Sequence, residues 1–247
     1  MKCLLTLLCF IAAVPLHAEE ITVAAASDLN FAIKEIIPAF ERTTGHKVRL
    51  TLGSSGNFYA QIINGAPFDV FLSADLNYPK ELERGGYALS GSTFVYAVGR
   101  IALWVPGRSS LNLEKLGMQS LADPSVRKIA IANPEHAPYG RAAVAAMKAL
   151  NVYEQVKSKL VMGENISQAA QFVQSGAADI GVIAVSIAMS GPMRIGGRHW
   201  LIPTDLYPRM DQGAVLLKRA KPGAKAFHEW LRGSQARAVF ERYGLGH

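Results

Sequence analysis

Cysteine is almost absent from this chain of 247 residues: Cys3 and Cys9 are the only two, and both lie near the N-terminus. The remaining residues therefore cannot form a disulfide bond, and their hydrophobic core must stabilise the fold alone. Long apolar runs are also missing beyond the N-terminal segment, so we expect no membrane-spanning helix there. At this length the chain can bury a sizeable core.

The first 18 residues are predicted to be a cleaved secretory signal. Lys2 provides a positive start, residues 4–14 an apolar core, and residues 15–18 a small-residue exit that ends at Ala18. The apolar run is too short to span a bilayer, which makes a retained anchor the weaker alternative. Cys9 is not preceded by small residues, so a lipidated cysteine is not expected. The exported chain would then begin at residue 19.

Motifs of the common hydrolases and nucleotide-binding enzymes are missing too. There is no Gly-x-Ser-x-Gly elbow, no HExxH and no phosphate-binding loop. Ser125 and Lys128 match a Ser-x-x-Lys pattern by chance, because its companion motifs do not occur. The histidines that we considered as metal ligands are scattered without metal-ligand spacing: His46, His136, His199 and His228. A binding protein explains this pattern better than an enzyme does.

The charge of the chain is moderately basic. The formal net charge is +7, and it becomes +6 (25 basic against 19 acidic residues) when Lys2 leaves with the signal. The basic residues are dispersed, with a modest concentration over residues 218–242, and they lack the interleaved aromatics that contact bases. We therefore expect no nucleic-acid partner.

Apolar strand-like runs alternate with helical patterns, which predicts an α/β fold with parallel strands. The chain is expected to pass into a second lobe within residues 94–105 and to return near residues 211–213. We therefore predict lobe 1 from residues 19–97 and 211–247, lobe 2 from residues 98–210, and a ligand cleft between them. The predicted strands cover residues 21–26, 47–52, 69–73, 128–132, 160–162 and 179–185, and the predicted helices cover 29–42, 76–84, 141–150, 167–175 and 227–240.

Four junctions between a strand and a helix carry the candidate binding residues. They lie near Ser27, at the loop of residues 53–57, near Tyr139 and near Ile166. Strand carboxyl ends face the cleft of such folds, and helix N-termini attract anions without Lys or Arg. The alternatives are a plain helix cap for Ser27, a Gly-Ser turn for Ser54 and Ser55, and packing roles for Tyr139 and Ile166.

The motifs at these junctions occur in the order of a known family. Residues 24–29 read AAASDL, residues 53–57 GSSGN, residues 65–75 GAPFDVFLSAD and residues 133–140 NPEHAPYG. With them the chain resembles the periplasmic molybdate-binding proteins, which are the solute receptors of molybdate ABC transporters. The resemblance covers essentially the whole mature chain, and the block of residues 65–75 is the most specific part.

The resemblance implies a two-lobed periplasmic-binding-protein fold of type II that holds molybdate, and usually tungstate, through neutral donors. By position, Ser27 and Ser55 would donate from lobe 1, and Tyr139 and the backbone N–H of Ile166 from lobe 2. Molybdenum would be bound only as the oxyanion, as transported ligand and not as a cofactor. The implied partner is an inner-membrane ABC permease, and the implied receptor is a monomer in the periplasm.

Two further candidates near the ligand are Ser54 and Asp28. A carboxylate beside a dianion is repelled, and more strongly in a cleft of low dielectric. We therefore expect the side chain of Asp28 to cap the helix at Leu29 and Asn30 and to face away from the ligand. Two rival hypotheses remain: a receptor for another oxyanion such as sulfate or phosphate, and a secreted hydrolase that uses Ser27 or Ser55.

Overall fold

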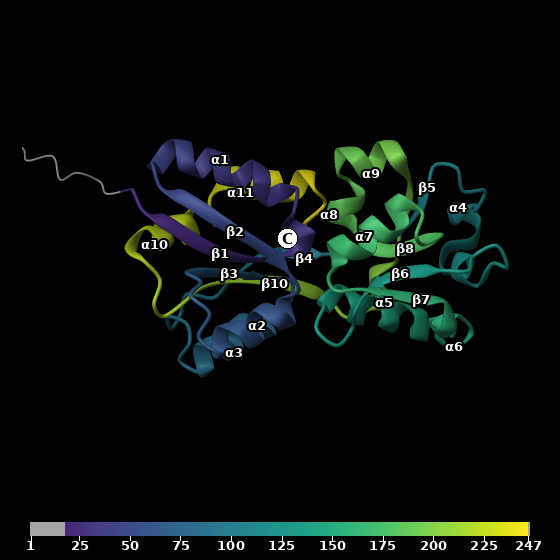
Figure 1. Ribbon diagram of the computed structural model, residues 1–247, viewed down its shortest axis with the longest axis horizontal. Coiled ribbons are helices and arrows are strands. Elements are labelled where there is room, and N and C mark those ends of the chain that lie inside the picture. The colour runs from purple at the N-terminus through teal and green to yellow at the C-terminus, as the bar shows by residue number, and fades with distance from the viewer. Residues whose placement is uncertain (1–17, 247) are drawn as a thin grey trace, which may run out of the picture.

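The computed structural model describes residues 18–246, so the predicted signal of residues 1–18 lies almost wholly outside the described part. The described chain forms two lobes side by side, each built on one five-stranded sheet (Figure 1). Lobe 1 contains the sheet with strand order β2-β1-β3-β10-β4, and lobe 2 the sheet with order β7-β6-β8-β5-β9. The α/β class and the two-lobed architecture predicted from the sequence are confirmed.

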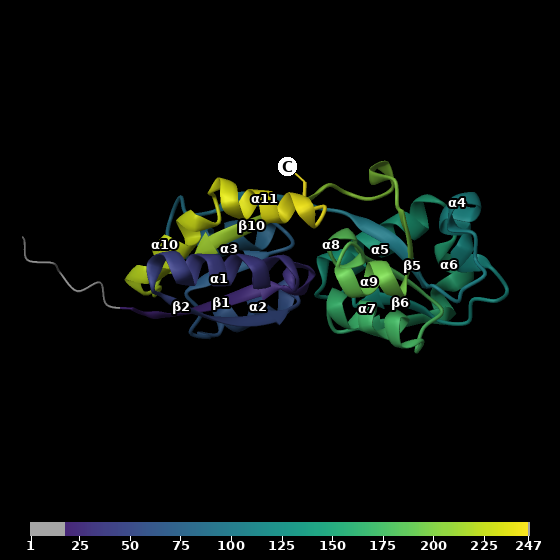
Figure 2. The ribbon, with the colours of Figure 1, turned by 90° about the horizontal axis from the view of Figure 1, so that it is seen from above.

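In lobe 1, helices cover both faces of the sheet. The α1 and α11 helices lie on one face and α2 and α3 on the other (Figures 1 and 2). The inner side of α1 buries Ile33, Ile36 and Phe40, as its apolar spacing predicts. The elements are β1 (Glu20–Ala26), η1 (Ser27–Leu29), α1 (Ala32–Thr44), β2 (Lys47–Gly53), α2 (Ser55–Ile63), β3 (Val70–Ser73), α3 (Asn77–Arg84), β4 (Phe94–Gly99), β10 (Met210–Leu216), α10 (Pro222–Trp230) and α11 (Ser234–Arg242).

Lobe 2 repeats this plan around a larger core. Its β6 and β8 strands are buried along their whole length, which explains their continuous apolar sequences. The elements are β5 (Ile101–Pro106), α4 (Leu113–Leu116), η2 (Gly117–Ala122), β6 (Ile129–Ala132), α5 (Pro138–Ala149), α6 (Tyr153–Val156), η3 (Lys157–Lys159), β7 (Leu160–Gly163), α7 (Ile166–Ser175), β8 (Ile180–Ala184), α8 (Val185–Ala188), α9 (Gly191–Gly196), β9 (Gly197–Leu201) and η4 (Thr204–Leu206).

The order of strands places the binding loops. In each sheet the first parallel strand, β1 or β6, lies between the two strands that follow it in the chain. The first crossover therefore runs to one side of that strand and the next returns to its other side, which creates a crevice at its carboxyl end. The loops after β1, β2, β6 and β7 begin at these carboxyl ends, and they face the other lobe.

The sheets are mixed, in contrast to the predicted parallel strands. The β10 strand is antiparallel to β3 and β4, and β5 is antiparallel to β8 and β9. These are the strands at the two crossings between lobes, where the chain enters each sheet from the side of the cleft. The residue boundaries predicted for the lobes stay a prediction.

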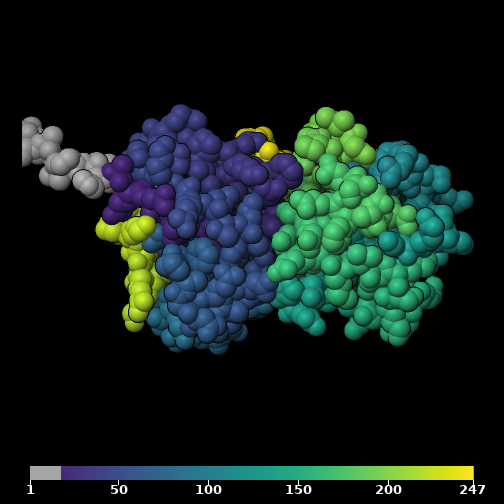
Figure 3. Space-filling view, viewed as in Figure 1, coloured from purple at the N-terminus to yellow at the C-terminus, as the bar shows by residue number. Residues whose placement is uncertain are grey.

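Among residues 18–246, no helix is both long enough and apolar enough to cross a membrane. The space-filling view shows that the two lobes touch along one seam (Figure 3). Hydrogen bonds cross this seam from Gly56 N to the His136 carbonyl at 2.9 Å and from Asn57 Nδ2 to Glu164 Oε1 at 2.9 Å. The structure therefore has its lobes closed on each other.

Candidate functional site

The predicted ligand residues come together around one small cavity between the lobes. Its lining includes all six candidates from the sequence: Ser27, Asp28, Ser54, Ser55, Tyr139 and Ile166. The cavity measures about 10 Å³, which is room for one water molecule at most. A tetrahedral oxyanion is larger than water, so the walls must move apart to admit one.

The loop between β2 and α2 contributes two buried hydroxyls. Ser55 Oγ accepts a hydrogen bond from Ala74 N at 2.9 Å, and no residue described here accepts its own hydrogen. Ser54 precedes the first residue of α2 in an extended conformation, but its hydroxyl makes no cap bond. Ser54 Oγ is buried and has no partner among the described residues. Both hydroxyls can therefore donate to a ligand in the cavity.

Ser27 begins the 3-10 turn η1 after β1, where its backbone and side chain contact lobe 2. Ser167 N donates to Ser27 Oγ at 3.3 Å, and Ser167 Oγ donates to the Ser27 carbonyl at 2.8 Å. The hydroxyl of Ser27 thus acts as an acceptor toward α7. Its hydrogen stays available for another oxygen.

Ile166 is the first residue of α7, where a backbone N–H has no acceptor within the helix. The preceding Asn165 caps the helix, since its Oδ1 accepts from Gln168 N at 3.1 Å. This cap fixes the direction of the first turn and leaves the N–H of Ile166 next to the cavity. The Ile166 side chain packs in the core of lobe 2.

Tyr139 lies in the first turn of α5 and reaches across to lobe 1. Its hydroxyl donates to Asp28 Oδ2 at 2.9 Å and accepts from Gln212 Nε2 at 2.8 Å. The hydroxyl has one hydrogen, and Asp28 receives it. In this closed state, therefore, the Tyr139 hydroxyl cannot also donate to a ligand.

The expectation that Asp28 faces away from the site is wrong. Asp28 lines the cavity and its side chain is buried, with Oδ2 accepting from Tyr139, which also lines the cavity, and, at 2.8 Å, from Gln212 Nε2. One donor, Tyr139, comes from α5 of lobe 2, and the other, Gln212, comes from β10 of lobe 1, so the carboxylate lies where the two lobes meet. The other oxygen, Oδ1, is buried without a partner among the described residues.

Burial controls the charge of Asp28. It raises the pKa of this carboxyl from 3.8 to about 6, although hydrogen bonds from Gln212, Tyr139 and nearby backbone N–H groups oppose the rise. Burial, together with the charge of Asp28, also raises the pKa of Tyr139 well above 10. The phenol is therefore protonated at physiological pH.

Sequence reasoning missed Gln212 and Ser186. Gln212 lies on β10, fully buried, and its amide binds both Asp28 and Tyr139. Ser186, at the start of α8, donates to the Asp28 carbonyl at 2.8 Å. A polar residue inside the apolar strand of residues 210–216 was the available signal for Gln212. Ser186 had no comparable signal in the sequence.

Gly99 leaves room for this polar network. A Cβ atom at this position would lie 2.7 Å from the Tyr139 hydroxyl and 2.8 Å from Gln212 Nε2. Any larger residue would therefore displace the two side chains that hold Asp28.

The arrangement of His136 does not support a Ser nucleophile. Its carbonyl accepts from Gly56 N, so the residue lies beside α2, but its ring Nε2 contacts the Glu164 carbonyl at 2.9 Å. Within residues 18–246, no hydrogen bond joins this ring to Ser55, whose Oγ accepts from Ala74 N. The hydrolase hypothesis needs a base in contact with the serine.

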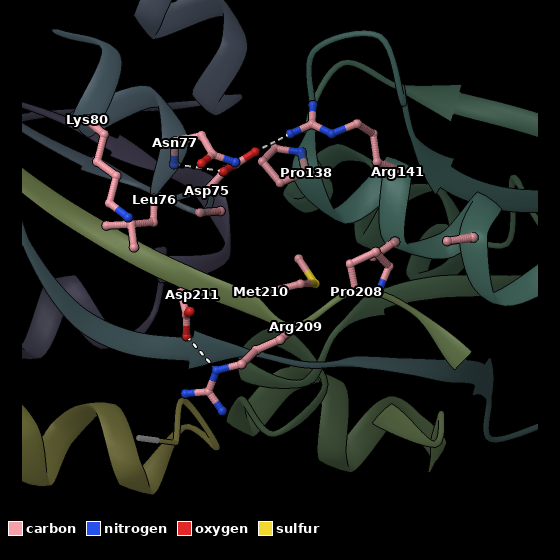
Figure 4. A pocket seen from close by; sticks show the side chains of 13 residues that line it. Asp75, Leu76, Asn77, Lys80, Pro138, Arg141, Pro208, Arg209, Met210 and Asp211 are labelled. Carbon is pink, nitrogen blue, oxygen red and sulfur yellow. Dashed lines mark hydrogen bonds and ion pairs between the residues drawn. The ribbon is translucent and has the colours of Figure 1, made fainter. Parts of the chain in front are cut away.

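A second hollow of about 410 Å³ adjoins the cavity at the lobe boundary (Figure 4). It shares Ala74 and Pro138 with the small cavity. Arg141 spans it and contacts Asp75 at 2.6 Å, while Arg209 contacts Asp211 at 2.7 Å. Although it is larger, we place the candidate site in the small cavity, because the uncharged donors meet there.

The chain matches the family model for the bacterial extracellular solute-binding proteins over residues 21–246. It is 41% identical to the molybdate-binding protein ModA of Azotobacter vinelandii, over 93% of this chain and 91% of that protein. The identity to ModA of Rhodobacter capsulatus is also 41%, over 94% and 90%. The solved structure of the periplasmic molybdate-binding protein of Azotobacter vinelandii superposes with a TM-score of 0.84, at 35% identity, over 91% of this chain and 97% of that one.

These matches span nearly the whole described chain. The protein is a member of the bacterial extracellular solute-binding protein family.

Proposed function

We propose that this protein binds molybdate in the small cavity between its lobes. The observation that carries the proposal is the meeting of uncharged donors from both lobes at one cavity. The 41% identity to two molybdate-binding proteins supports the choice of anion.

Four groups would hold the oxyanion. Ser27 and Ser55 would donate their hydroxyl hydrogens from lobe 1, and the first N–H of α7, at Ile166, would donate from lobe 2. Tyr139 would form a wall of the cavity, and its hydroxyl would have to leave Asp28 before it could donate. Ser54 is a further donor, because its hydroxyl has no partner in the described part of the chain.

The strength of such a site follows from charged hydrogen bonds. Each hydrogen bond to a charged group contributes about 1.5–3 kcal/mol. The hydroxyl and the backbone N–H of Ser27 and of Ser55, with the Tyr139 hydroxyl and the Ile166 N–H, would make six such bonds. Together they give roughly 9–18 kcal/mol before dehydration of the dianion is subtracted. A net binding free energy of about −8 to −12 kcal/mol corresponds to micromolar to nanomolar affinity. Cavity size would select molybdate over sulfate, because a smaller anion leaves donors unsatisfied.

Isothermal titration calorimetry of residues 19–247 with molybdate, tungstate, sulfate and phosphate tests the proposal. We expect tight binding of molybdate and of tungstate, which has the same shape and charge, and weak binding of sulfate. Sulfate binding as tight as that of molybdate would refute selection by size. Absence of heat with molybdate and tungstate would refute the function.

The Asp28 carboxylate in the cavity favours one alternative, a receptor for an oxyanion that carries a hydrogen, such as hydrogen phosphate. An acceptor such as Asp28 Oδ1 would bind that hydrogen. The phosphate arm of the same titration decides between the two.

In the cell, we propose that the protein acts in the periplasm after loss of residues 1–18. It would carry the oxyanion as a monomer, without a resident cofactor, and deliver it to an ABC permease. The lobes would close on the ligand, and the permease would recognise the closed form.

A further inference from the structure

In the buried network of Asp28, Tyr139 and Gln212, the hydrogen-bond donors are distributed unequally between the two carboxylate oxygens of Asp28. Oδ2 of Asp28 receives two donors, Tyr139 at 2.9 Å and Gln212 at 2.8 Å. The N–H groups of Asp28 and Leu29 lie near the carboxylate and lower its pKa, but Oδ1 makes no hydrogen bond of normal length and angle within residues 18–246, although Asp28 is 1% exposed and lines the cavity. Oδ2 thus accepts two hydrogen bonds from side chains, whereas Oδ1 accepts none.

A dianion bound in this cavity would be destabilised by the unpaired oxygen Oδ1 of Asp28. An ionised Asp28 would put a negative oxygen against a doubly negative ligand inside a dry site, where charges interact strongly. A proton on Oδ1 changes the sign of that contact, because the neutral acid donates a hydrogen bond from Oδ1 while Oδ2 still accepts from Tyr139 and Gln212.

We infer that oxyanion binding takes up one proton from solvent at Asp28 Oδ1, and that the neutral carboxylic acid then serves as a further donor to the ligand. This inference rests on the proposed function of the cavity. It also assigns roles to Tyr139 and Gln212, which become positioning residues that hold Oδ2 and direct Oδ1 toward the ligand.

None of the neighbouring groups described below can take up the proton in place of Asp28. The titratable groups that face it are Tyr139 from α5 and Tyr96 from β4, and burial keeps the pKa of both phenols well above 10. Ser186 from α8 and Gln212 from β10 are neutral. Arg100, between β4 and β5, donates to the Gly244 carbonyl and is not among the groups that shift the pKa of Asp28. The pKa of Asp28 in the empty protein is about 6, so its carboxyl is ionised above that pH. To bind the anion as a neutral acid it must then take up a proton.

The test is calorimetric titration of residues 19–247 with molybdate at several pH values, each in two buffers of different ionisation enthalpy. The difference in heat between buffers counts the protons taken up. We expect close to one proton at pH 8 and close to none at pH 5. The affinity should fall roughly tenfold per pH unit above pH 7, since one proton is bound with each anion.

Two variants complete the experiment. Asp28→Asn has the shape of the neutral acid, and its amide can donate where Oδ1–H would, so it should bind molybdate without proton uptake and with an affinity independent of pH. Asp75→Asn changes another carboxylate at the lobe boundary, which pairs with Arg141 and does not line the small cavity, and it should keep the wild-type proton count.

The outcomes separate the inference from the proposed function. Tight molybdate binding at pH 8 without proton uptake by the wild type overturns the inference and leaves the function intact. Proton uptake that persists in Asp28→Asn also overturns it, because a group other than Asp28 would then accept the proton. Absence of molybdate binding at every pH, in the wild type and in both variants, overturns the function itself. The wild-type count requires no variant, so a misfolded Asp28→Asn does not prevent the decision.

Discussion

At the residue scale, Ser55 is the candidate whose hydroxyl is best prepared for a ligand. Ala74 N already donates to its oxygen, which fixes the side chain while leaving its hydrogen available. We expect Ser55→Ala to weaken molybdate binding by about 1–3 kcal/mol, because one hydrogen bond to a charged ligand is lost. Calorimetric titration measures this loss. Ser175→Ala, which removes an exposed hydroxyl at the end of α7, serves as the control. An unchanged affinity of Ser55→Ala would mean that Ser55 only shapes the turn.

Ser54 leads to a prediction with opposite effects on two quantities. Its hydroxyl is buried without a partner in the described part of the chain, which destabilises the empty protein. Ser54→Ala should therefore raise the free energy of unfolding without ligand by up to about 1 kcal/mol, and it should also weaken molybdate binding. Chemical denaturation and titration of the same sample check both signs. A loss of stability in the empty variant would contradict this account.

At the element scale, the first turn of α2 can contact the loop before α5 only because residue 56 is a glycine. A Cβ atom at Gly56 would lie 2.7 Å from the His136 carbonyl oxygen, closer than such atoms approach. Gly56 N also donates to that carbonyl across the seam. The absence of a side chain at this position therefore permits the lobes to close.

We expect Gly56→Ala to oppose closure while each lobe stays folded. Molybdate affinity should fall at least tenfold, because binding energy would be spent on displacing the backbone of lobe 2. Small-angle scattering should show a larger radius of gyration than for the wild type with saturating molybdate. Wild-type dimensions together with wild-type affinity would show that the loop adapts to the added methyl group.

The control is Gly191→Ala, because no other group lies within 4 Å of the added methyl group. Gly65→Ala, in the loop after α2, is unsuitable because the positive φ of Gly65 strains any other residue.

The elements that the sequence predicts best are those with uninterrupted apolar runs, such as β3 and β8. The sequence pattern predicts that α5 starts at Arg141, but the helix begins at Pro138, since proline is favoured at the first position of a helix. The helix predicted from Leu29 begins at Ala32, since residues 27–29 form a separate 3-10 turn.

The binding loops were predictable because strand ends and small residues mark them locally. The network around Asp28 was not, because its partners lie 111 and 184 residues away in the sequence. A local reading of Asp28 favours a helix cap, and only the packing of the two lobes shows which donors reach the carboxylate first.

At the scale of the whole molecule, Asp28 should make stability depend on pH. Its pKa is about 6 in the folded protein and near 3.8 in the unfolded chain, so the folded state binds more protons between these values. The free energy of unfolding should therefore fall as the pH rises from about 4 to about 6, by at most ~3 kcal/mol.

Asp28→Asn should remove this loss because its amide carries no charge. Thermal unfolding without ligand should show a variant that matches the wild type at pH 4 and exceeds its Tm at pH 8. A constant difference between the two proteins across this range would assign the change to packing and not to ionisation.

The lack of cysteine in residues 19–247 has a practical consequence for the seam between the lobes. Asn57 and Glu164 meet across it at 2.9 Å, one from each lobe, and their hydrogen bond is exposed to solvent. A cysteine introduced at either position would be the sole thiol of residues 19–247. A fluorophore attached there would change its surroundings when the halves separate, so the scaffold lends itself to an optical sensor of its solute.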